Sequence, residues 1–261
     1  MPTIPFVKAS ACGNDFLLVE GGFAPQDLTA ATRHMCDRHE GVGADGVEWI
    51  YPGEDADVEI RLINADGSEA EISGNGTRCV AALLCAERGK EKITIRTGAG
   101  IKTCVFISRN EQEHEFEMEM GQADVSAELS LATSFGMVKG IPVSMGNPHF
   151  VSFVDQFPTD WTRRGAEIQR DAHFKQGVNI EWLVIDNKHH IQARFYERGA
   201  GETQSSGTGS CAAASAAMAT GRAESPVKVQ APGGTQTVRL EVGKIFLRGS
   251  ARIVCRGDFY L

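Results

Sequence analysis

Two short stretches of the chain combine a hydroxyl group, a glycine-rich turn and a helix-forming run in the same order. Ser73 precedes Gly-Asn-Gly and an alanine- and leucine-rich run, and Ser206, 133 residues later in a chain of 261, precedes Gly-Thr-Gly and an alanine-rich run. Serine caps helix N-termini, where the first backbone N–H groups are unpaired and carry a partial positive charge. Glycines at such an end let a ligand approach the backbone closely. Each stretch therefore predicts a helix head that can bind an anion such as a carboxylate.

Two matching helix heads suggest one reaction, proton transfer at the carbon beside a carboxylate. Two heads that grip one carboxylate would withdraw part of its charge, so that its α-carbon loses a proton more easily. A residue on each head would then flank the α-carbon, one to take a proton and one to return it to the opposite face. A single serine before a helix is ordinarily only a cap. The repetition at half the chain length and the polar flanks at 64–71 and 196–203, which a core would not hold unpaired, favour binding.

The segments that must position these heads are mostly strands. Apolar and polar residues alternate in several runs, such as 58–63, with the period of a strand. Helices are expected at 29–38, 79–88, 161–170 and 212–218, and residues 121–135, which hold few large apolar side chains, are expected to link the two halves. Neither half has the alternating βαβαβ order of a Rossmann fold, and no G-x-G-x-x-G run follows a strand. An internal duplication of two α/β units is the simplest interpretation.

The composition is that of a soluble globular protein and disfavours several classes of partner. Hydrophobic residues make up 42% and charged residues 23% of the chain, and the formal net charge of −8 disfavours nucleic acid. No apolar run approaches the ~20 residues of a membrane helix, and the N-terminus lacks the pattern of a signal peptide, so we expect a cytoplasmic protein without a membrane partner. The seven cysteines include no C-x-x-C pair and the seven histidines do not cluster with acids, so we expect no metal site.

A series of short motifs, taken together, resembles the diaminopimelate epimerase family. Any one motif is weak evidence, whereas the set runs in family order over nearly the whole chain. The motifs are Gly13-Asn14-Asp15-Phe16, Asp37-Arg38-His39 through Gly43-Ala44-Asp45-Gly46, Asn64-Ala65-Asp66-Gly67-Ser68-Glu69, Gly74-Asn75-Gly76-Thr77-Arg78-Cys79, Gly146-Asn147-Pro148-His149, Gly177-Val178-Asn179, Tyr196-Glu197-Arg198-Gly199, Gly201-Glu202-Thr203 and Gly207-Thr208-Gly209.

The resemblance implies a cofactor-independent amino-acid epimerase of lysine and cell-wall biosynthesis, which interconverts LL- and meso-diaminopimelate without a metal ion or pyridoxal phosphate. It implies an α+β fold of two pseudo-symmetric domains, each a strand-rich barrel around a central helix, with the active site in the interdomain cleft. We expect the domains at residues 1–120 and 121–250, with a final strand near 251–261 packing back onto the first domain. The expected partner is the small-molecule substrate, and a homodimer is an expectation from the family alone.

The resemblance also assigns roles to particular residues. The two acid/base positions fall on Ser73 and Ser206, and His149 and Glu197 match the groups that help to deprotonate them. The residues that match those binding the reacting amino-acid end of the substrate are Asn14, Gly74, Asn75, Gly207 and Thr208. Those that match polar contacts to the substrate, chiefly at its distal end, are Asn64, Asn147, Asn179 and Arg198. An arginine–carboxylate fork suits that distal end, so Asn64 and Arg198 favour a diamino-dicarboxylate over a simple amino acid.

Both acid/base positions depart from the family pattern, which has cysteine where this chain has Ser73 and Ser206. A thiol has a pKa of about 8.5 that helix N-termini lower further, whereas a serine hydroxyl is a far weaker acid. We therefore expect an inactive or impaired Cys-to-Ser form that still binds its ligand. Three interpretations stay open: an engineered pair of substitutions, a natural serine homologue acting as an isomerase or dehydratase on another amino acid, and a non-catalytic amino-acid-binding protein.

Overall fold

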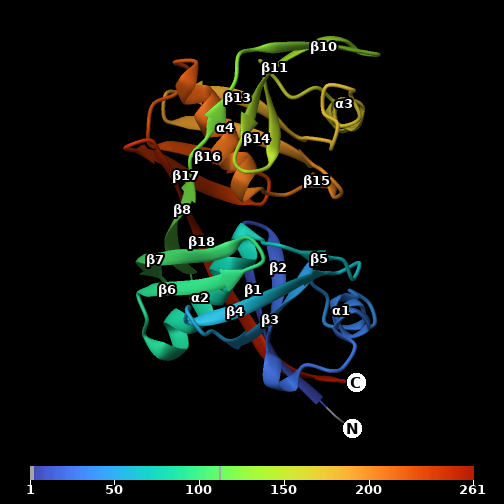
Figure 1. Ribbon diagram of the computed structural model, residues 1–261, viewed down its shortest axis with the longest axis vertical. Helices are drawn as coiled ribbons and strands as arrows, with labels where there is room; N and C mark the ends of the chain where they lie inside the picture. Colours follow the sequence, from blue (N-terminus) through green and yellow to red (C-terminus); the bar gives the residue numbers. More distant parts are fainter. Residues whose placement is uncertain (1–2, 112) are drawn as a thin grey trace. The chain divides into compact units, whose positions relative to one another are not determined.

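The computed structural model describes residues 3–111 and 113–261, which form a strand-rich α+β protein with four α-helices and eighteen strands (Figure 1). The chain divides into two compact units. The first unit comprises the residues up to Met118 together with Gly249–Leu261, and the second comprises Glu119–Arg248. Among the described residues, none of the helices combines the length and the apolar character needed to cross a bilayer.

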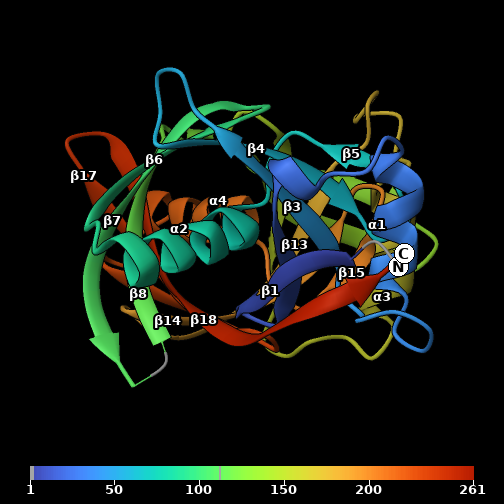
Figure 2. The same ribbon diagram turned by 90° about the horizontal axis from the view of Figure 1, so that it is seen from below.

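The strands of the first unit surround one buried helix, α2. In chain order its elements are β1 (Thr3–Ala11), β2 (Asn14–Glu20), the 3-10 helix η1 (Gly21–Phe23), α1 (Leu28–Cys36), β3 (Gly46–Pro52), β4 (Val58–Asn64), β5 (Glu69–Ala70), α2 (Gly74–Arg88), β6 (Lys92–Thr97) and β7 (Gly100–Asn110). α2 packs against β1, β2, β6 and β7 (Figure 2), and its residues from Asn75 to Leu84 are buried. The expected C-cap is confirmed, since Gly89 ends α2 with a left-handed φ of 64°.

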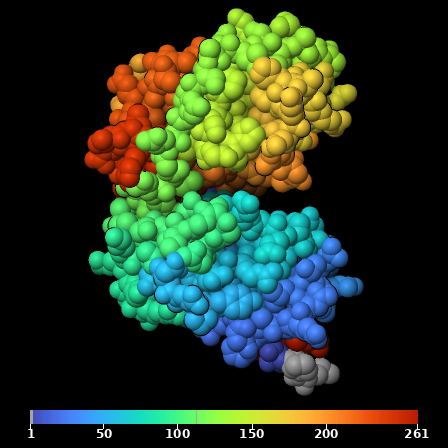
Figure 3. All heavy atoms as spheres, in the orientation of Figure 1, coloured from blue at the N-terminus to red at the C-terminus, as the bar shows by residue number. Residues whose placement is uncertain are grey.

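Two long strands each have residues in both units, and they complete the ring of strands in the first unit. They are β8 (Glu113–Gly121) and β18 (Lys244–Tyr260). Pairing follows the closed ring β1, β2, β3, β4, β6, β7, β8, β18 and back to β1. The pairing of β18 with β1 sets Tyr260 opposite Thr3, and Figure 3 shows the red C-terminal atoms beside the dark-blue atoms of the first strand. The first unit is therefore a barrel built from both ends of the chain.

The second unit repeats this arrangement around α4 (Gly207–Ala219). Its other elements are β9 (Asp124–Val125), β10 (Leu129–Thr133), β11 (Gly136–Ser144), β12 (Pro148–Phe153), α3 (Trp161–Ile168), β13 (Asn179–Asn187), β14 (His190–Glu197), β15 (Gly201–Thr203), β16 (Val227–Ala231) and β17 (Gly234–Glu241). Strands β9, β11, β12, β13, β14, β16 and β17 all pack against α4. Because strands lie on all its sides, the helix is alanine-rich and buried all round.

The expectation that residues 121–135 form only a link is wrong. β9 and β10 lie in this stretch, and each pairs antiparallel with β11. The large residues of β10 alternate, so that Leu131 faces the core while its neighbours Ser130 and Ala132 are exposed. A strand with only one buried face needs few large apolar residues, which is why the composition did not reveal it.

The two units are one fold repeated at a constant offset along the chain. β1 and β11 begin 133 residues apart, as do α1 and α3, β3 and β13, and α2 and α4. The parallel pair β2–β3 sets Phe16 beside Gly46, and the parallel pair β12–β13 sets His149 beside Asn179 at the same offset. The expected pseudo-symmetry is confirmed, and a residue between β1 and the head of α2 has its counterpart 133 positions later.

Candidate functional site

The head of α2 carries the first of the two repeated motifs. Ser73 is the N-cap in extended backbone, and its Oγ accepts a hydrogen bond from the N–H of Gly76 at 3.1 Å. The carbonyl oxygen of Ser73 accepts two hydrogen bonds from Thr77, from its N–H and its hydroxyl, both at 2.8 Å. A Cβ placed on Gly74 would meet nothing within 4 Å. The head is therefore a fixed turn with open space at its first residue.

Asn14, at the start of β2, is held against this head by hydrogen bonds. Asn75 donates through Nδ2 to Oδ1 of Asn14 at 2.6 Å, and Asn14 donates through Nδ2 to Oδ2 of Asp45 at 3.1 Å. Arg78, which is fully buried, donates to Oδ1 of Asn75. The amide groups of both asparagines are thus fixed in orientation.

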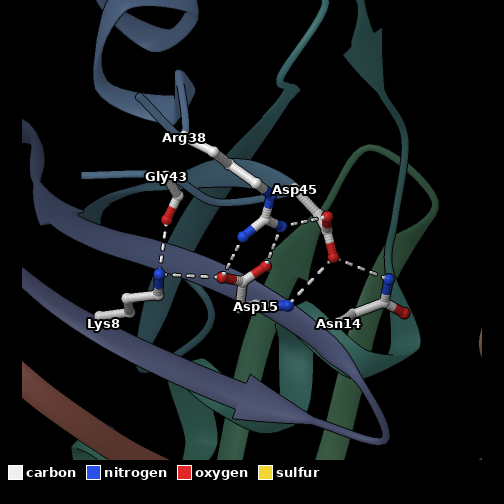
Figure 4. A network of polar contacts seen from close by, with 6 residues as sticks. All are labelled: Lys8, Asn14, Asp15, Arg38, Gly43 and Asp45. Atoms are coloured by element: carbon white, nitrogen blue, oxygen red, sulfur yellow. Dashed lines mark hydrogen bonds and ion pairs between the residues drawn. The ribbon is translucent and has the colours of Figure 1, made fainter. Parts of the chain in front are cut away.

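Asn14 is connected through Asp45 to a network of charged side chains (Figure 4). Arg38 bridges the carboxylates of Asp15 and Asp45 at 2.7 and 2.9 Å, and Lys8 lies 3.0 Å from Asp15. Burial raises the pKa of Asp15, but hydrogen bonds from Arg38 and Lys8 outweigh burial and hold the pKa below its usual value. Asp15 therefore stays a carboxylate at neutral pH and keeps both cations in place.

Glu48, on β3, is buried beneath the head of α2. Its Oε1 lies so close to Gly76 that a Cβ at that position would overlap it, so only glycine fits there. Neither carboxyl oxygen has a hydrogen-bond partner among the described residues. Burial raises the pKa of Glu48 from 4.5 to about 8, because a charge is costly away from water. The group is an uncharged acid at neutral pH.

Ser206 caps α4 as Ser73 caps α2. Its Oγ accepts a hydrogen bond from the N–H of Gly209 at 3.1 Å, and its carbonyl oxygen accepts one from the N–H of Ser210 at 3.0 Å. The hydroxyl also hydrogen-bonds to the side chain of Glu197, the last residue of β14. Burial raises the pKa of Glu197, and the hydrogen bond from Ser206 opposes part of that rise. A carboxyl group with a raised pKa beside a hydroxyl can accept its proton and return it.

His149, on β12, forms a buried pair with Glu181 on β13. Nδ1 of His149 lies 2.7 Å from Oε1 of Glu181, and both side chains are 0% exposed. The second ring nitrogen, Nε2, lies 3.0 Å from Oδ1 of Asn147, whose Nδ2 reaches the hydroxyl of Thr208 at 3.5 Å. Burial raises the pKa of Glu181, and the neighbouring His149 opposes the rise. A polar chain thus runs from the buried Glu181 to the first turn of α4.

Asn179 fixes the backbone that carries Arg198. Its Nδ2 donates to a carbonyl oxygen at the start of β12 at 3.0 Å, and its Oδ1 accepts the backbone N–H of Arg198 at 2.9 Å. The side chain of Arg198 is exposed and donates to a carbonyl oxygen of the loop before β13 at 3.1 Å. The guanidinium group therefore faces solvent from a rigid base and can reach a carboxylate.

The predicted site residues fall into two sets, one in each unit. In the first unit, Asn14 and Asn75 contact each other beside the head that Ser73 caps, and the side chain of Asn64 donates to Ser68 at 3.0 Å. In the second unit, Asn147 joins His149 to Thr208, Glu197 bonds to Ser206, Asn179 holds the backbone of Arg198, and Gly207 is the first residue of α4.

The motifs did not reveal the buried glutamates, although the chain holds a signal for them. A Glu-Trp pair occurs at Glu48-Trp49 and again at Glu181-Trp182, at the 133-residue offset of the two serines. Each glutamate lies among buried strand residues that are mostly apolar. An acidic residue repeated in such a setting indicates a polar position that the fold keeps at both heads.

Comparisons with known proteins agree with this architecture. A family model described as diaminopimelate epimerase matches residues 6–126 and 141–254. The chain is 34% identical to the diaminopimelate epimerase of Halothermothrix orenii over 99% of this chain and 98% of that protein, and 36% identical to that of Acidiphilium cryptum over 97% and 95%. Among solved structures, a phenazine biosynthesis protein of the PhzF family from Bacillus anthracis has a TM-score of 0.78 at 18% identity, with all of both chains covered. A hydroxyproline epimerase from Agrobacterium vitis has a TM-score of 0.72 at 16% identity, covering 99% of this chain and 91% of that one.

Proposed function

Because this chain belongs to the diaminopimelate epimerase family, a family of isomerases, we propose that it interconverts LL- and meso-diaminopimelate by two-base proton transfer at the α-carbon. The observation that carries the proposal is the pair of helix heads capped by Ser73 and Ser206. The asparagine near the first head, Asn14, has its counterpart in Asn147, 133 residues later, which is also the separation of the two serines. Inversion of one carbon needs an acid/base group for each face, and the repeat supplies two.

The helix heads would bind and activate the reacting carboxylate. Their first N–H groups carry a partial positive charge, and the open space at Gly74 leaves room for a ligand at the head of α2. Charge that develops on the carboxylate as the α-proton leaves is stabilised by these N–H groups. No cofactor is required for that stabilisation, and we propose that the reaction proceeds without one.

The second unit supplies a route for the proton. As Ser206 Oγ takes the α-proton, its own proton passes to the carboxylate of Glu197, to which it is hydrogen-bonded. Ser73 gives its hydroxyl proton to the opposite face of the carbanion and regains one from solvent, and the reverse reaction exchanges the roles. A hydroxyl is a weaker acid than a thiol, so the same steps are slower than with cysteine at these positions.

Arg198 is our candidate for the distal carboxylate that distinguishes diaminopimelate from simple amino acids. Its guanidinium group is exposed, and its backbone is fixed by Asn179. A guanidinium binds a carboxylate through two parallel hydrogen bonds, which adds geometric selectivity.

The test is exchange of the α-proton in deuterated water. Incorporation of deuterium into meso- and LL-diaminopimelate, followed by NMR and unchanged by dialysis against a chelator, supports the proposal. Exchange with another amino acid, such as glutamate, histidine or lysine, in place of diaminopimelate would favour a serine homologue of different specificity. Binding without exchange would fit either an inactive Cys-to-Ser form or an amino-acid-binding protein, and exchange restored by cysteine at positions 73 and 206 would single out the inactive form. Absence of binding would refute the substrate.

Substitution of Asp45 by alanine is expected to raise the dissociation constant for diaminopimelate about tenfold. Oδ2 of Asp45 accepts hydrogen bonds from Asn14 and from the N–H of Asp15, both at 3.1 Å, so its loss leaves the Asn14 amide held by Asn75 alone. The side chain of Asp45 is 38% exposed, so water replaces the lost bonds and stability changes little. Calorimetric titration measures the affinity. Asp55→Ala, which removes another exposed aspartate paired with an arginine, is the matched control and is expected to bind normally.

A further inference from the structure

This inference rests on the proposed function and concerns a residue to which that function assigns no role. We propose that Glu48 is a positioning residue, whose buried and uncharged carboxyl group keeps the head of α2 able to bind the substrate carboxylate.

Glu48 and Ser73 contact the same glycine from the head of α2. Oε1 of Glu48 lies against Gly76, and a Cβ on Gly76 would lie 3.3 Å from Cβ of Ser73. In the sheet, Glu48 stands between Leu18 of β2 and Leu62 of β4, which are both buried and apolar. Its carboxyl group therefore lies against the first turn of α2, between strand neighbours that are apolar.

In the second unit, the glutamate equivalent to Glu48 has a histidine partner. Glu181 is the counterpart of Glu48, and its Oε1 would lie 2.9 Å from a Cβ on Gly209, the counterpart of Gly76. Glu181 has His149 at 2.7 Å, whereas the counterpart of His149 in the first unit is the buried Phe16. The first unit thus keeps the carboxyl group at the helix head and lacks the imidazole that would pair with it.

The ionisable groups on the elements packed around Glu48 do not replace that imidazole. α2 contributes Cys79 and Arg78, and β2 contributes Asp15, which Arg38 and Lys8 already neutralise. Burial raises the pKa of the Cys79 thiol, and Glu48 and Asp15 raise it further while Arg78 opposes them. Cys79 therefore stays an uncharged thiol. Cys12, whose Sγ lies 3.7 Å from Arg78, is present in the starting chain and in Glu48→Gln alike, so a difference between these two proteins reports Glu48.

The charge of Glu48 decides how the helix head interacts with an anion. The N-terminus of a helix carries about half a positive charge, which an uncharged carboxyl group beneath it leaves available to a ligand. A carboxylate at Gly76 would cancel that charge and repel a second carboxylate at short range. The ligand affinity of this head is accordingly high while Glu48 holds its proton and falls when Glu48 loses it.

The inference is tested at the head itself, with acetate as the probe. Amide NMR shifts of residues 74–76 report acetate binding at α2, and those of 207–209 report binding at α4 in the same sample. Between about pH 6 and about pH 10, either side of the pKa of about 8, the acetate affinity at α2 is expected to fall about tenfold or more. In Glu48→Gln, an uncharged isostere, it is expected to stay constant. Equal pH dependence in the two proteins would overturn the inference.

A second variant tests the same idea in the opposite direction. Phe16→His places beside Glu48 the partner that His149 gives Glu181, and that partner opposes the rise in pKa that burial causes. The fall in acetate affinity at α2 is therefore expected at a lower pH than in the starting chain. The same pH dependence in a folded Phe16→His protein would also contradict the inference. The acetate result does not depend on diaminopimelate. Acetate binding at residues 74–76 without any diaminopimelate binding would therefore reject the proposed function and leave the role of Glu48 standing.

Discussion

Cysteine at both helix caps, in the double variant Ser73→Cys with Ser206→Cys, is expected to accelerate α-proton exchange of diaminopimelate by about 10⁴-fold, or about 5 kcal/mol of activation free energy. A positioned acid/base group contributes about 10²–10⁴-fold, and the proposed mechanism uses one on each face of the α-carbon. Each cap stands at a helix N-terminus, where the partial positive charge lowers the pKa of a thiol and increases its thiolate fraction. Ser73 and Ser206 already cap the two helices, so each thiol would take the place of the hydroxyl it replaces.

The measurement is the rate of deuterium incorporation by each single variant and by the double variant. Each single variant is expected to recover less than the double variant, because inversion needs a competent group on each face. Ser205→Cys is the matched control, since Ser205 is buried beside Ser206 but does not cap the helix, and it is expected to change the rate little. Equal rates in the starting chain and the double variant would show that the hydroxyls suffice.

Substitution of Glu48 by glutamine is expected to remove a large pH dependence from the free energy of unfolding. The folded protein holds a proton on Glu48 up to a pKa of about 8, whereas the unfolded chain releases it near the ordinary value of 4.5. Between these values the unfolded state binds fewer protons, so raising the pH favours unfolding by about 1.4 kcal/mol for each pH unit. The stabilisation is complete below pH 4.5 and is lost by about pH 8, a change on the order of 5 kcal/mol.

Denaturant unfolding at a series of pH values measures this effect as the difference between the two proteins. Natural domains are stable by about 5–15 kcal/mol, so the expected change is a large fraction of the total. The difference between Glu48→Gln and the starting chain should grow in favour of glutamine from pH 4.5 to about 8 and then level off. The exposed Glu54 provides the control, because Glu54→Gln should run parallel to the starting chain. Parallel curves for Glu48→Gln as well would mean that Glu48 is ionised in the folded protein.

The parts of the fold that follow from local chemistry could be predicted from the sequence. Ser73 before a Gly-x-Gly turn and Gly89 after an apolar run mark the two ends of α2, and Ser206 marks the start of α4 in the same way. The repetition of the motif also predicted two similar units, since one repeat at half the chain length implies one fold used twice. These signals are local, so no knowledge of long-range contacts was needed to read them.

The parts that depend on long-range contacts could not be predicted in this way. Glu48 interrupts an apolar strand and resembles an ordinary solvent-facing residue until α2 is placed over it. The network around Asn14 joins Lys8, Arg38 and Asp45 from separate segments, and their spacing carries no period. The resemblance places Asn64 at a substrate-contact position, but it gave no sign of the hydrogen bond from the Asn64 side chain to Ser68. Side-chain partners of this kind follow from the tertiary fold and not from the sequence pattern.

The long strand β18 also determines the order in which the two units can be completed on the ribosome. The second unit is a continuous stretch, Glu119–Arg248, and all of its residues have been synthesised before Gly249. The first unit lacks the strand that pairs with β1 until residues up to Tyr260 have emerged, so its barrel stays open while the second unit can already close. Multidomain chains generally fold from the N-terminus during synthesis. Here the first unit to be made is the last to be finished, and the exposed edge of β1 needs protection until then.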